Sequence, residues 1–466
     1  LYFEPLSWNE VKAVLDKEKP NSVIIQLGGQ TPLKLARNIV KAGYTIAGST
    51  LEVIESTEDR DLFQKLCNTL NINQPQSEIA TSADALSKAV QNIGYPVLLR
   101  PSYVLGGRAM RVVQNDRELN NYLKVLSTSD DDGNPFNLGP ILVDEYLTDT
   151  VEIDVDLISD GTEVFIAGIL EHLELAGVHS GDSTAVLPPF SISDSLVEEI
   201  KEKSTKLAIS LKVKGLLNIQ FAIKAGVIYI LEANPRASRT MPFVAKVTSN
   251  QIIKAGTLTM LGHSIKEIKE NTNYLSGKTK KIAIKKAIFP WSRFPAEDTM
   301  LGPEMKATGE VLGIGKTFGT ALNKAYAASG VEIGKKQKGV FITLSDDQKQ
   351  YFVETARQFE KLGFKIYTTE GTGSYLSSFG ISSTIVERAN KEKPTSLTII
   401  EDELISLVIN TPTYANEYSD GWKIRRLSHS TGVAVVSSVR EAEAFIFAFT
   451  EKESVLNDLE AIQNVS

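Results

Sequence analysis

The sequence predicts a multidomain protein that combines α/β and α+β domains, and three observations support this fold class. The chain has 466 residues, too many for one hydrophobic core and enough for about three domains. Strand-like and helix-like segments alternate in residues 1–57 and again in residues 338–466, as they do in parallel α/β sheets. Between these regions, residues 216–239 contain two apolar runs around a turn, which indicates a β-hairpin.

The composition excludes several classes of protein. With 42% hydrophobic and 23% charged residues the chain is globular, and its net charge of −7 gives no basis for binding nucleic acid. No segment resembles a signal peptide or a membrane span. We therefore expect no nucleic-acid partner, no membrane partner and a cytoplasmic location. The only cysteine, Cys67, has helical spacing and is expected to be a packed residue rather than a nucleophile.

Residues 1–57 have a βαβ pattern. A helix is expected at 8–15, a buried strand at 22–27, a second helix at about 31–42 and a second strand at 44–47. Because the sequence does not begin with methionine, we expect a fragment or a processed product. This pattern predicts strands of a parallel α/β sheet.

A second domain is expected over residues 58–262. Asp59 and Arg60 begin a helix, and a strand ends at Arg100. The following Gly106-Gly107 pair would let the backbone approach an anion, although such a pair is more often a plain turn. Strands are also expected at 141–147 and 151–157, and the second of these carries Glu152, Asp154 and Asp156 on one face, for which a solvated strand face is the alternative.

The hairpin at 216–239 carries the strongest chemical signal. If its strands pair symmetrically about Gly226, Gln220 lies opposite Glu232, and Glu232 and Asn234 share a face. A carboxylate and two amide oxygens suit Mg²⁺, which prefers few protein ligands together with substrate phosphates. A hairpin with a simply hydrated polar face is the alternative.

Two arginines, Arg236 and Arg239, follow the hairpin directly after Pro235. Guanidinium groups offer a planar fork of donors to phosphate oxygens. An ion site beside two such groups predicts the binding of nucleotide phosphates.

Further elements are expected along the rest of the chain. Residues 193–211 and 243–263 are helical in pattern, and residues 263–334 are interpreted as a connection that returns to the first domain. A separate doubly wound α/β domain is expected over 335–466. Its expected strands are 339–343, 365–368, 383–386, 404–410 and 433–436.

These motifs resemble a known family. The run 218–220 with 231–236 resembles the metal-binding signature of ATP-grasp ligases. Together with 100–110, 176–182 and 301–311, it closely resembles the C-terminal half of carbamoyl phosphate synthetase large subunits over nearly the whole chain. The resemblance implies a partial pre-ATP-grasp domain (1–57), an ATP-grasp domain (58–262), a connecting segment (263–334) and a methylglyoxal-synthase-like allosteric domain (335–466).

The resemblance also implies an activity. Carbamate would be phosphorylated by ATP to carbamoyl phosphate, which feeds arginine biosynthesis, pyrimidine biosynthesis or both. The implied cofactors are ATP and two ions of Mg²⁺ or Mn²⁺, with K⁺ as a further candidate. The implied partners are a glutaminase small subunit and the N-terminal synthetase half, in an oligomer. Two rivals stay open: another ATP-grasp ligase with a different acceptor, and a nucleotide-sensing fragment without catalysis.

Site residues are carried over from the family position by position. The expected metal ligands are Gln220, Glu232 and Asn234. The expected catalytic residues are Arg100, Arg236 and Arg239, the last two orienting carbamate or the transferred phosphoryl group. The expected ATP-binding residues are Arg60, Arg100, Glu145, Leu147, Glu152, Val178, His179, Ser180, Gln220 and Glu232. The hinge residues Glu145 and Leu147 are expected to act through their backbone groups.

The C-terminal domain is expected to bind a nucleotide monophosphate, UMP rather than IMP. The matching effector residues are Lys349, Thr369, Thr372 and Arg388. In ornithine-activated relatives, carboxylates match Glu174 and Asp182, but the position of a third carboxylate is occupied here by Lys286. Because an ammonium group repels the amines of ornithine, we expect the protein to be insensitive to ornithine.

Overall fold

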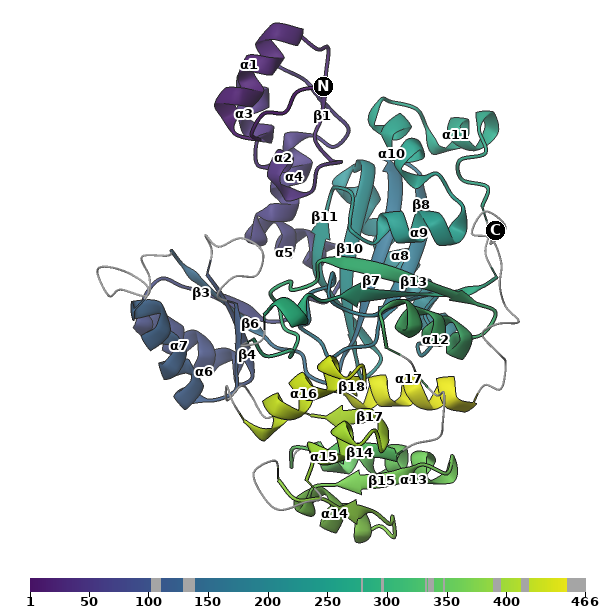
Figure 1. Ribbon diagram of the computed structural model, residues 1–466. Coiled ribbons are helices and arrows are strands. Elements are labelled where there is room, and N and C mark those ends of the chain that lie inside the picture. Colours follow the sequence, from purple (N-terminus) through teal and green to yellow (C-terminus); the bar gives the residue numbers. More distant parts are fainter. Residues whose placement is uncertain are drawn as a thin grey trace. The chain divides into compact units, whose positions relative to one another are not determined.

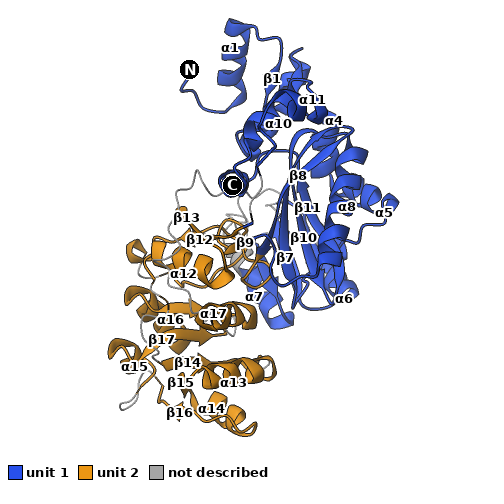
Figure 2. Cartoon of the chain, turned by 90° about the vertical axis from the view of Figure 1, so that its right-hand side faces the viewer, with its two compact units in different colours: residues 1–171, 187–280, 461–466 blue, residues 172–186, 281–460 orange. Residues whose placement is uncertain are grey.

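The computed structural model divides the chain into two compact units, coloured separately in Figure 2. The first contains residues 1–171, 187–280 and 461–466, and the second contains residues 172–186 and 281–460. The structure describes residues 1–101, 110–128, 139–277, 280–294, 297–331, 333, 339–346, 348–388, 395–411 and 419–450. Each unit is described by itself.

The N-terminal part of the first unit confirms the expected βαβ pattern, with shorter strands. Strands β1 and β2 pair in parallel, Val23 with Ile46. The expected helix between them is divided into two, and Ile39 and Ile54 are buried between the helices. The elements are α1 (Trp8–Glu18), β1 (Val23–Ile24), α2 (Gln30–Leu33), α3 (Ala36–Lys41), β2 (Ile46–Ala47) and α4 (Leu51–Glu58).

A four-stranded antiparallel sheet follows, in the order β3-β6-β4-β5 (Figure 1). Leu86 and Val90 of one helix and Leu119 and Tyr122 of another form its core with the apolar residues of the strands. The elements are α5 (Arg60–Thr69), β3 (Ser77–Ala80), α6 (Ala83–Ile93), β4 (Val97–Pro101), β5 (Arg111–Val113), α7 (Asp116–Thr128) and β6 (Ile141–Glu145). The Gly106-Gly107 pair lies outside the described residues.

The longest strands of the first unit lie in the order β11-β10-β7-β8 and pair antiparallel. Alternate residues of β10, such as Leu217 and Ile219, join a core with Phe63 of α5 and Leu207 of α8. On the other face, α10 approaches β10 so closely that a Cβ on Gly256 would meet Leu216 at 2.4 Å. The elements are β7 (Val151–Asp160), β8 (Val164–His172), α8 (Asp194–Leu211), β10 (Lys214–Lys224), β11 (Val227–Asn234), α9 (Met241–Thr248), α10 (Ile252–Met260) and α11 (Ile265–Asn271).

The β10–β11 hairpin confirms the expected pairing of Gln220 with Glu232, but the strands are not paired symmetrically about Gly226. Lys224 pairs with Val227, so the turn consists of Ala225 and Gly226, which both have positive φ, 49° and 79°. Such two-residue turns match the twist of the strands. A bulge between Gln220 and its neighbour then shifts the register by one residue.

The second unit begins with strands in the order β9-β12-β13, of which β12 and β13 are antiparallel. Strands β12 and β13 and helix α12, which lie within the expected connecting segment 263–334, are grouped with the second unit. Strand β13 and α12 pack closely: a Cβ on Gly313 would meet the Ala321 carbonyl of α12 at 2.1 Å. The elements are β9 (Ala185–Leu187), β12 (Ile282–Ile288), a 3₁₀ turn (Trp291–Arg293), β13 (Gly309–Gly315) and α12 (Phe318–Ala328).

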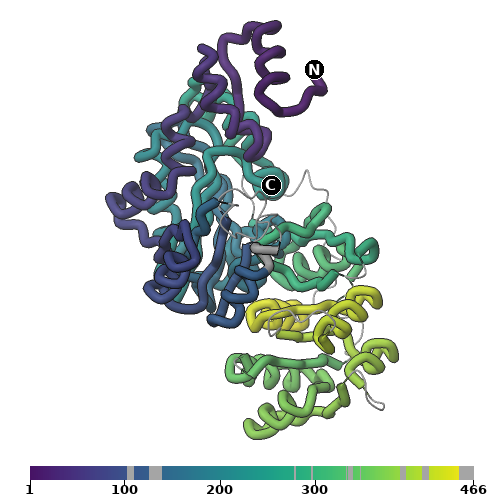
Figure 3. Tube along the Cα trace, turned by 90° about the vertical axis from the view of Figure 1, so that its left-hand side faces the viewer, coloured from purple at the N-terminus to yellow at the C-terminus, as the bar shows by residue number. Residues whose placement is uncertain are grey.

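The C-terminal part of the second unit, green to yellow in Figure 3, is a parallel sheet in the order β16-β15-β14-β17-β18. This arrangement is the expected doubly wound α/β fold. The elements are β14 (Gly339–Thr343), a 3₁₀ turn (Lys349–Phe352), α13 (Val353–Lys361), β15 (Lys365–Thr368), α14 (Glu370–Ser377), β16 (Thr384–Ile385), α15 (Thr398–Glu401), β17 (Ile405–Asn410), α16 (Asp420–Ser430), β18 (Ala434–Val436) and α17 (Val439–Thr450).

Candidate functional site

The predicted metal ligands lie together on one face of the β10–β11 hairpin. Gln220 is paired with Glu232 across the strands, and Asn234 Nδ2 donates a hydrogen bond to Glu232 Oε1 at 2.8 Å. That bond leaves the second carboxylate oxygen of Glu232 and the amide oxygen of Asn234 as acceptors. Because Glu232 is exposed and all three groups supply oxygen, this donor set fits a hard cation such as Mg²⁺.

The segment after the hairpin is fixed by the N-terminal part of the same unit. Gln26 is fully buried, and its side-chain Nε2 donates a hydrogen bond to the Pro235 carbonyl at 2.7 Å. Its backbone carbonyl accepts a hydrogen bond from the Ala237 amide at 2.8 Å. Arg236 Nε donates to Gln30 Oε1 at 3.0 Å. Burial lowers the pKa of Arg236. The backbone on both sides of Arg236 therefore has little freedom.

Asp156 of β7 anchors the next part of this segment. Its carboxylate accepts hydrogen bonds from Asn218 Nδ2 at 2.9 Å, Ser238 Oγ at 2.7 Å and Thr240 Oγ1 at 2.6 Å. Asp156 is 0% exposed and Asp154 is 2% exposed, so the alternative of a solvated strand face is wrong for these two carboxylates. Burial raises the pKa of Asp156 to about 6.

Arg60 and Arg100, which come from α5 and β4, meet at Asp144 of β6. Each guanidinium forms an ion pair with the nearly buried Asp144 carboxylate, and Ser77 Oγ donates to the same carboxylate at 2.7 Å. Arg100 Nε is buried and has no hydrogen-bond partner among the described residues. Burial lowers the pKa of Arg60. Two guanidinium groups held by one carboxylate carry a net positive charge, which suits an anion such as a phosphate chain.

The predicted hinge residues lie at the end of the same sheet. The Glu145 amide donates to the Gln76 carbonyl at 2.8 Å, so its N–H group is already used. Leu147 is 5% exposed, and its carbonyl accepts from Thr150 at 3.4 Å. Glu152 lies near the start of β7 and is half-buried.

Val178, His179 and Ser180 belong to the second unit and are half-buried there. The Gly181 amide donates to His179 Nδ1 at 3.0 Å, which places the proton of a neutral imidazole on Nε2. The His179 amide donates to the Gly302 carbonyl at 2.8 Å. Lys285 of β12 is 1% exposed and donates from Nζ to the Ser180 carbonyl at 2.8 Å. The turn that carries His179 is thus pinned at several points.

Lys286, next along β12, lies in a buried charged cluster. Its Nζ lies 4.1 Å from the centre of the Tyr326 ring. Burial lowers the pKa of Lys286, while Glu174 and Glu441 oppose that shift. The Glu174 carboxylate is already bonded to the amide and the hydroxyl of Thr184, each at 2.6 Å. The cluster therefore already contains a cation.

In the C-terminal sheet, three of the four predicted effector residues lie together. Gly371 lies between Thr369 and Thr372 in the sequence, and a Cβ added to it would lie 3.4 Å from Lys349 Nζ. Lys349 Nζ also forms an ion pair with Asp346 at 2.6 Å. The buried Thr372 hydroxyl accepts from the Leu344 amide at 3.1 Å. These residues follow the carboxyl ends of β14 and β15, the edge at which parallel sheets bind ligands. Arg388 is exposed after β16, and no described contact joins it to the other three.

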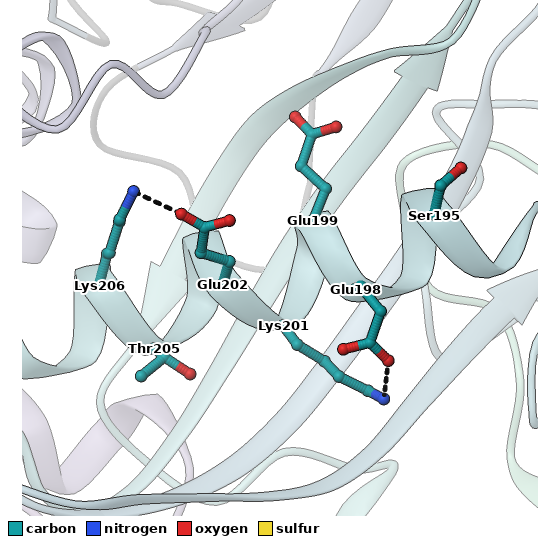
Figure 4. Close-up of a pocket in the computed structure, with 7 residues that line it drawn as sticks. All are labelled: Ser195, Glu198, Glu199, Lys201, Glu202, Thr205 and Lys206. Carbon is teal, nitrogen blue, oxygen red and sulfur yellow. Dashed lines mark hydrogen bonds and ion pairs between the residues drawn. The ribbon is translucent and has the colours of Figure 1, made fainter.

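Other features of the described residues carry no site. Cys67 is 0% exposed and burial raises its pKa to about 12, as expected for a packed thiol. The described part of the chain contains no cluster of His, Cys, Asp and Glu side chains that could hold a metal, and no helix suited to crossing a membrane. A hollow along α8 is lined by exposed residues paired within the helix, such as Lys201 with Glu198 (Figure 4). Such pairs mark a solvated face.

Sequence reasoning missed several residues that organise the site. Asp144 was not singled out, and Asp156 was noted only as sharing a strand face with Glu152 and Asp154; only the strand register shows what the two face. Gln26 lies in the expected strand 22–27 and Gln30 lies just before the expected helix at about 31–42, and neither was singled out. Charged residues inside a buried strand were the available signal for the first two.

Comparison with protein families matches three parts of the chain. Residues 59–268 match the model described as "Carbamoyl-phosphate synthase L chain, ATP binding domain", residues 1–56 the "Carbamoyl phosphate synthase preATP-grasp domain", and residues 351–437 the "MGS-like domain". The chain is 43% identical to the carbamoyl phosphate synthase large chain, C-terminal section, of Aquifex aeolicus, covering 96% of this chain and 84% of the relative. It is 41% identical to the large chain of Archaeoglobus fulgidus, covering 99% of this chain and 42% of that protein.

Solved structures share the fold at low sequence identity. The biotin carboxylase domain of Hydrogenobacter thermophilus 2-oxoglutarate carboxylase, in complex with MgADP, ADP and bicarbonate, matches with a TM-score of 0.55 at 16% identity, covering 70% of this chain and 78% of that chain. A biotin carboxylase domain of a single-chain bacterial carboxylase matches with a TM-score of 0.51 at 14% identity, covering 69% and 75%.

Proposed function

The chain belongs to the family of carbamoyl phosphate synthase large chains, and we propose that it transfers the γ-phosphoryl group of ATP to carbamate, giving carbamoyl phosphate and ADP. The observation that supports this proposal is the β10–β11 hairpin, which carries the oxygen-bearing side chains of Gln220, Glu232 and Asn234 on one face and is followed directly by two arginines. The family is one of ATP-grasp ligases, and the proposal adds the acceptor.

The chemistry of this transfer suits the groups on the chain. A carbamate oxygen attacks the γ-phosphorus while the bond from that phosphorus to the β,γ-bridging oxygen breaks. Reactants and products carry the same total charge, so no proton has to be removed and no general base is required. Catalysis then consists of positioning the reactants and neutralising charge.

Arg236 and Arg239 are proposed to orient the carbamate and the transferred phosphoryl group. Arg236 is held through Gln30, and the backbone beside it is held through Gln26. A preset guanidinium loses little freedom when it binds an oxyanion, so more of the interaction energy is available for the transition state.

Gln220, Glu232 and Asn234 would hold Mg²⁺ or Mn²⁺, in agreement with the hard oxygen donors found there. A bound divalent cation supplies neutralisation of the phosphate charge. The proposal of two ions and the further candidate K⁺ rest on the family resemblance alone.

Arg60 and Arg100 are proposed to bind the ATP phosphates, with Asp144 aligning both guanidinium groups. His179, with its proton on Nε2, is proposed to act as a neutral hydrogen-bond donor to ATP, and Val178 and Ser180 are proposed as further ATP-binding residues. Since the Glu145 amide is already bonded to Gln76, adenine would use the Glu145 carbonyl and the Leu147 amide. Glu152 would bind the ribose hydroxyls.

The C-terminal sheet is proposed to bind a nucleotide monophosphate, UMP rather than IMP, through Lys349, Thr369, Thr372 and Arg388. The juxtaposition of the first three supports this proposal. Lys286 supports insensitivity to ornithine, because its ammonium group already lies near Glu174 and Glu441.

The wider biological setting is proposed from the relatives. The chain spans 42% of the Archaeoglobus fulgidus large chain, so an N-terminal synthetase half would supply the rest of the enzyme. A glutaminase small subunit would supply ammonia in an oligomeric, cytoplasmic assembly. The product would enter arginine or pyrimidine biosynthesis.

The test is the reverse half-reaction. The chain is incubated with MgADP and carbamoyl phosphate, and ATP is measured by luciferase. We expect ATP formation that requires both substrates and a divalent cation. Binding of MgADP without any ATP formation would overturn the proposal in favour of a nucleotide-sensing role. ATP formation from acetyl phosphate at the same rate would indicate a different acceptor.

A further inference from the structure

Asp156 is a fully buried carboxylate that the phosphoryl-transfer chemistry does not use. It is 0% exposed, and no ion pair among the described residues includes it, although its charge acts on Arg236 at longer range. Its three hydrogen bonds come from neutral groups on Asn218, Ser238 and Thr240. A buried charge without an opposite charge is costly, and an uncharged residue of similar size would avoid that cost. Its presence therefore calls for a role other than stability.

The donors to Asp156 indicate what that role is. Two of the three, Ser238 and Thr240, flank Arg239 directly, and both hydroxyls also lie 2.9 Å from one another. The Ser238 hydroxyl accepts from the Met241 amide at 3.0 Å, which extends the connection to the start of α9. One carboxylate thus fixes the backbone on both sides of Arg239.

The opposite end of the same segment is held independently. Gln26 bonds to the Pro235 carbonyl and the Ala237 amide, on either side of Arg236. Residues 235–241 are therefore tied at one end to the N-terminal part of the unit and at the other end to β7. Both arginines lie between the two attachments.

We propose that Asp156 is a positioning residue, which holds the segment 235–241 so that Arg236 and Arg239 point at the reacting oxyanions. This inference rests on the proposed function. Both carboxylate oxygens are needed, because Oδ1 accepts from Asn218 and Ser238 while Oδ2 accepts from Thr240. Asparagine at this position puts an NH2 group in place of one of the two acceptor oxygens, so the Thr240 hydroxyl loses the oxygen to which it donates, and the contact is kept only if that hydroxyl turns round to accept.

The test compares Asp156→Asn with Asp160→Asn. Asp160 lies on the same strand and its carboxylate accepts from the backbone of Thr162, Glu163 and Ile265, at 2.7 to 2.8 Å, so the control removes a similar set of bonds without touching the arginine segment. The readouts are the rate of ATP formation from MgADP and carbamoyl phosphate, the unfolding midpoint, and hydrogen exchange of the peptide that covers 235–241.

For Asp156→Asn we expect kcat to fall about 10- to 100-fold with KM for MgADP unchanged, since small misplacements of positioning groups have effects of this size. Hydrogen exchange of the backbone amides should be faster than in the wild type within 235–241 and unchanged in β7 and β10. The unfolding midpoint should be no lower than that of Asp160→Asn, whose kcat should stay within about twofold of the wild type. Ser238→Ala with Thr240→Val should reproduce the loss, and should add little to Asp156→Asn.

A wild-type kcat in Asp156→Asn, or unchanged exchange within 235–241, would overturn the inference. Faster exchange throughout the sheet with a lower midpoint would also overturn it, because that pattern belongs to a purely structural residue. If the wild type itself forms no ATP, the proposed function fails, and the exchange comparison still decides whether Asp156 holds the segment.

Discussion

Replacing Arg425 by methionine should destabilise the second unit by several kcal/mol, because its guanidinium is the centre of a buried ion pair. Arg425 of α16 donates from Nε to Asp298 Oδ1 at 2.9 Å and from Nη1 to Asn410 Oδ1 at 2.6 Å. The two charged side chains are 7% and 17% exposed. Methionine keeps the apolar stem and removes only the charge and the donors.

The magnitude follows from what is left behind. Without Arg425, the Asp298 carboxylate keeps the hydrogen bond from the Met300 backbone amide at 3.1 Å and loses its only ion pair among the described residues. Removing one partner of a buried pair costs about 3–5 kcal/mol. The control is Lys423→Met on the same helix, whose Nζ lies 3.8 Å from Asp420 in a partly exposed pair worth less than about 1 kcal/mol.

The same change should affect regulation. Asn410 ends β17, next to the proposed effector edge, while the segment after Asp298 donates through the Lys306 and Ala307 amides to Asp182 at 2.8 and 2.9 Å. Arg425 therefore connects the C-terminal sheet with the turn that carries His179. We expect Arg425→Met to bind UMP and to lose most of the effect of UMP on the rate.

The assay is urea unfolding followed by tryptophan fluorescence, since Trp291 and Trp422 both belong to this unit. A double-mutant cycle with Asp298→Asn should give a coupling energy of about 2–3 kcal/mol. Equal unfolding free energies for Arg425→Met and Lys423→Met would refute the reasoning, and so would a coupling energy near zero.

Three further predictions concern charged residues. Arg100→Ala should lower the rate of ATP formation about 10- to 100-fold, whereas the exposed Arg117 on α7 should tolerate alanine; equal rates would contradict the phosphate assignment. Because burial raises the pKa of Asp156 to about 6 from 3.8, its contribution to stability is complete below pH 3.8 and is lost as the pH rises through 6, about 3 kcal/mol in all. Asp156→Asn should therefore remove that decline in the free energy of urea unfolding between about pH 4 and 6, and an unchanged pH dependence would show that Asp156 does not titrate there. Ornithine at millimolar concentration should leave the rate unchanged because of Lys286, and activation would contradict that argument.

Local patterns in the sequence were sufficient for much of the fold. Period-two alternation predicted the faces of β10 and β11, so the pairing of Gln220 with Glu232 could be expected before the bulge was known. The parallel C-terminal sheet followed from alternating strands and helices. The hairpin of β12 and β13 was missed, because the packing of Gly313 against α12 is a tertiary contact that no local pattern encodes.

Part of the candidate site could likewise be predicted from local sequence patterns, and part of it depends on tertiary contacts. Residues in a continuous motif, such as Glu232, Asn234 and Arg236, could be named from the sequence. The partners of Asp144 and Asp156 could not be named, because they lie on strands and loops that are distant along the chain. The burial of these two carboxylates could not be predicted either, because the sequence of a strand does not show which elements cover each of its faces.

We propose that the hairpin face binds the metal that supports phosphoryl transfer to carbamate. The most direct measurement is the Mg²⁺ dependence of ATP formation from ADP and carbamoyl phosphate in Glu232→Ala, with Glu202→Ala on the exposed face of α8 as the control (Figure 4). Loss of one ligand should reduce the maximal rate by at least about 100-fold or shift the Mg²⁺ requirement strongly upward, with the unfolding midpoint unchanged. Wild-type rate and Mg²⁺ dependence in Glu232→Ala would contradict the account.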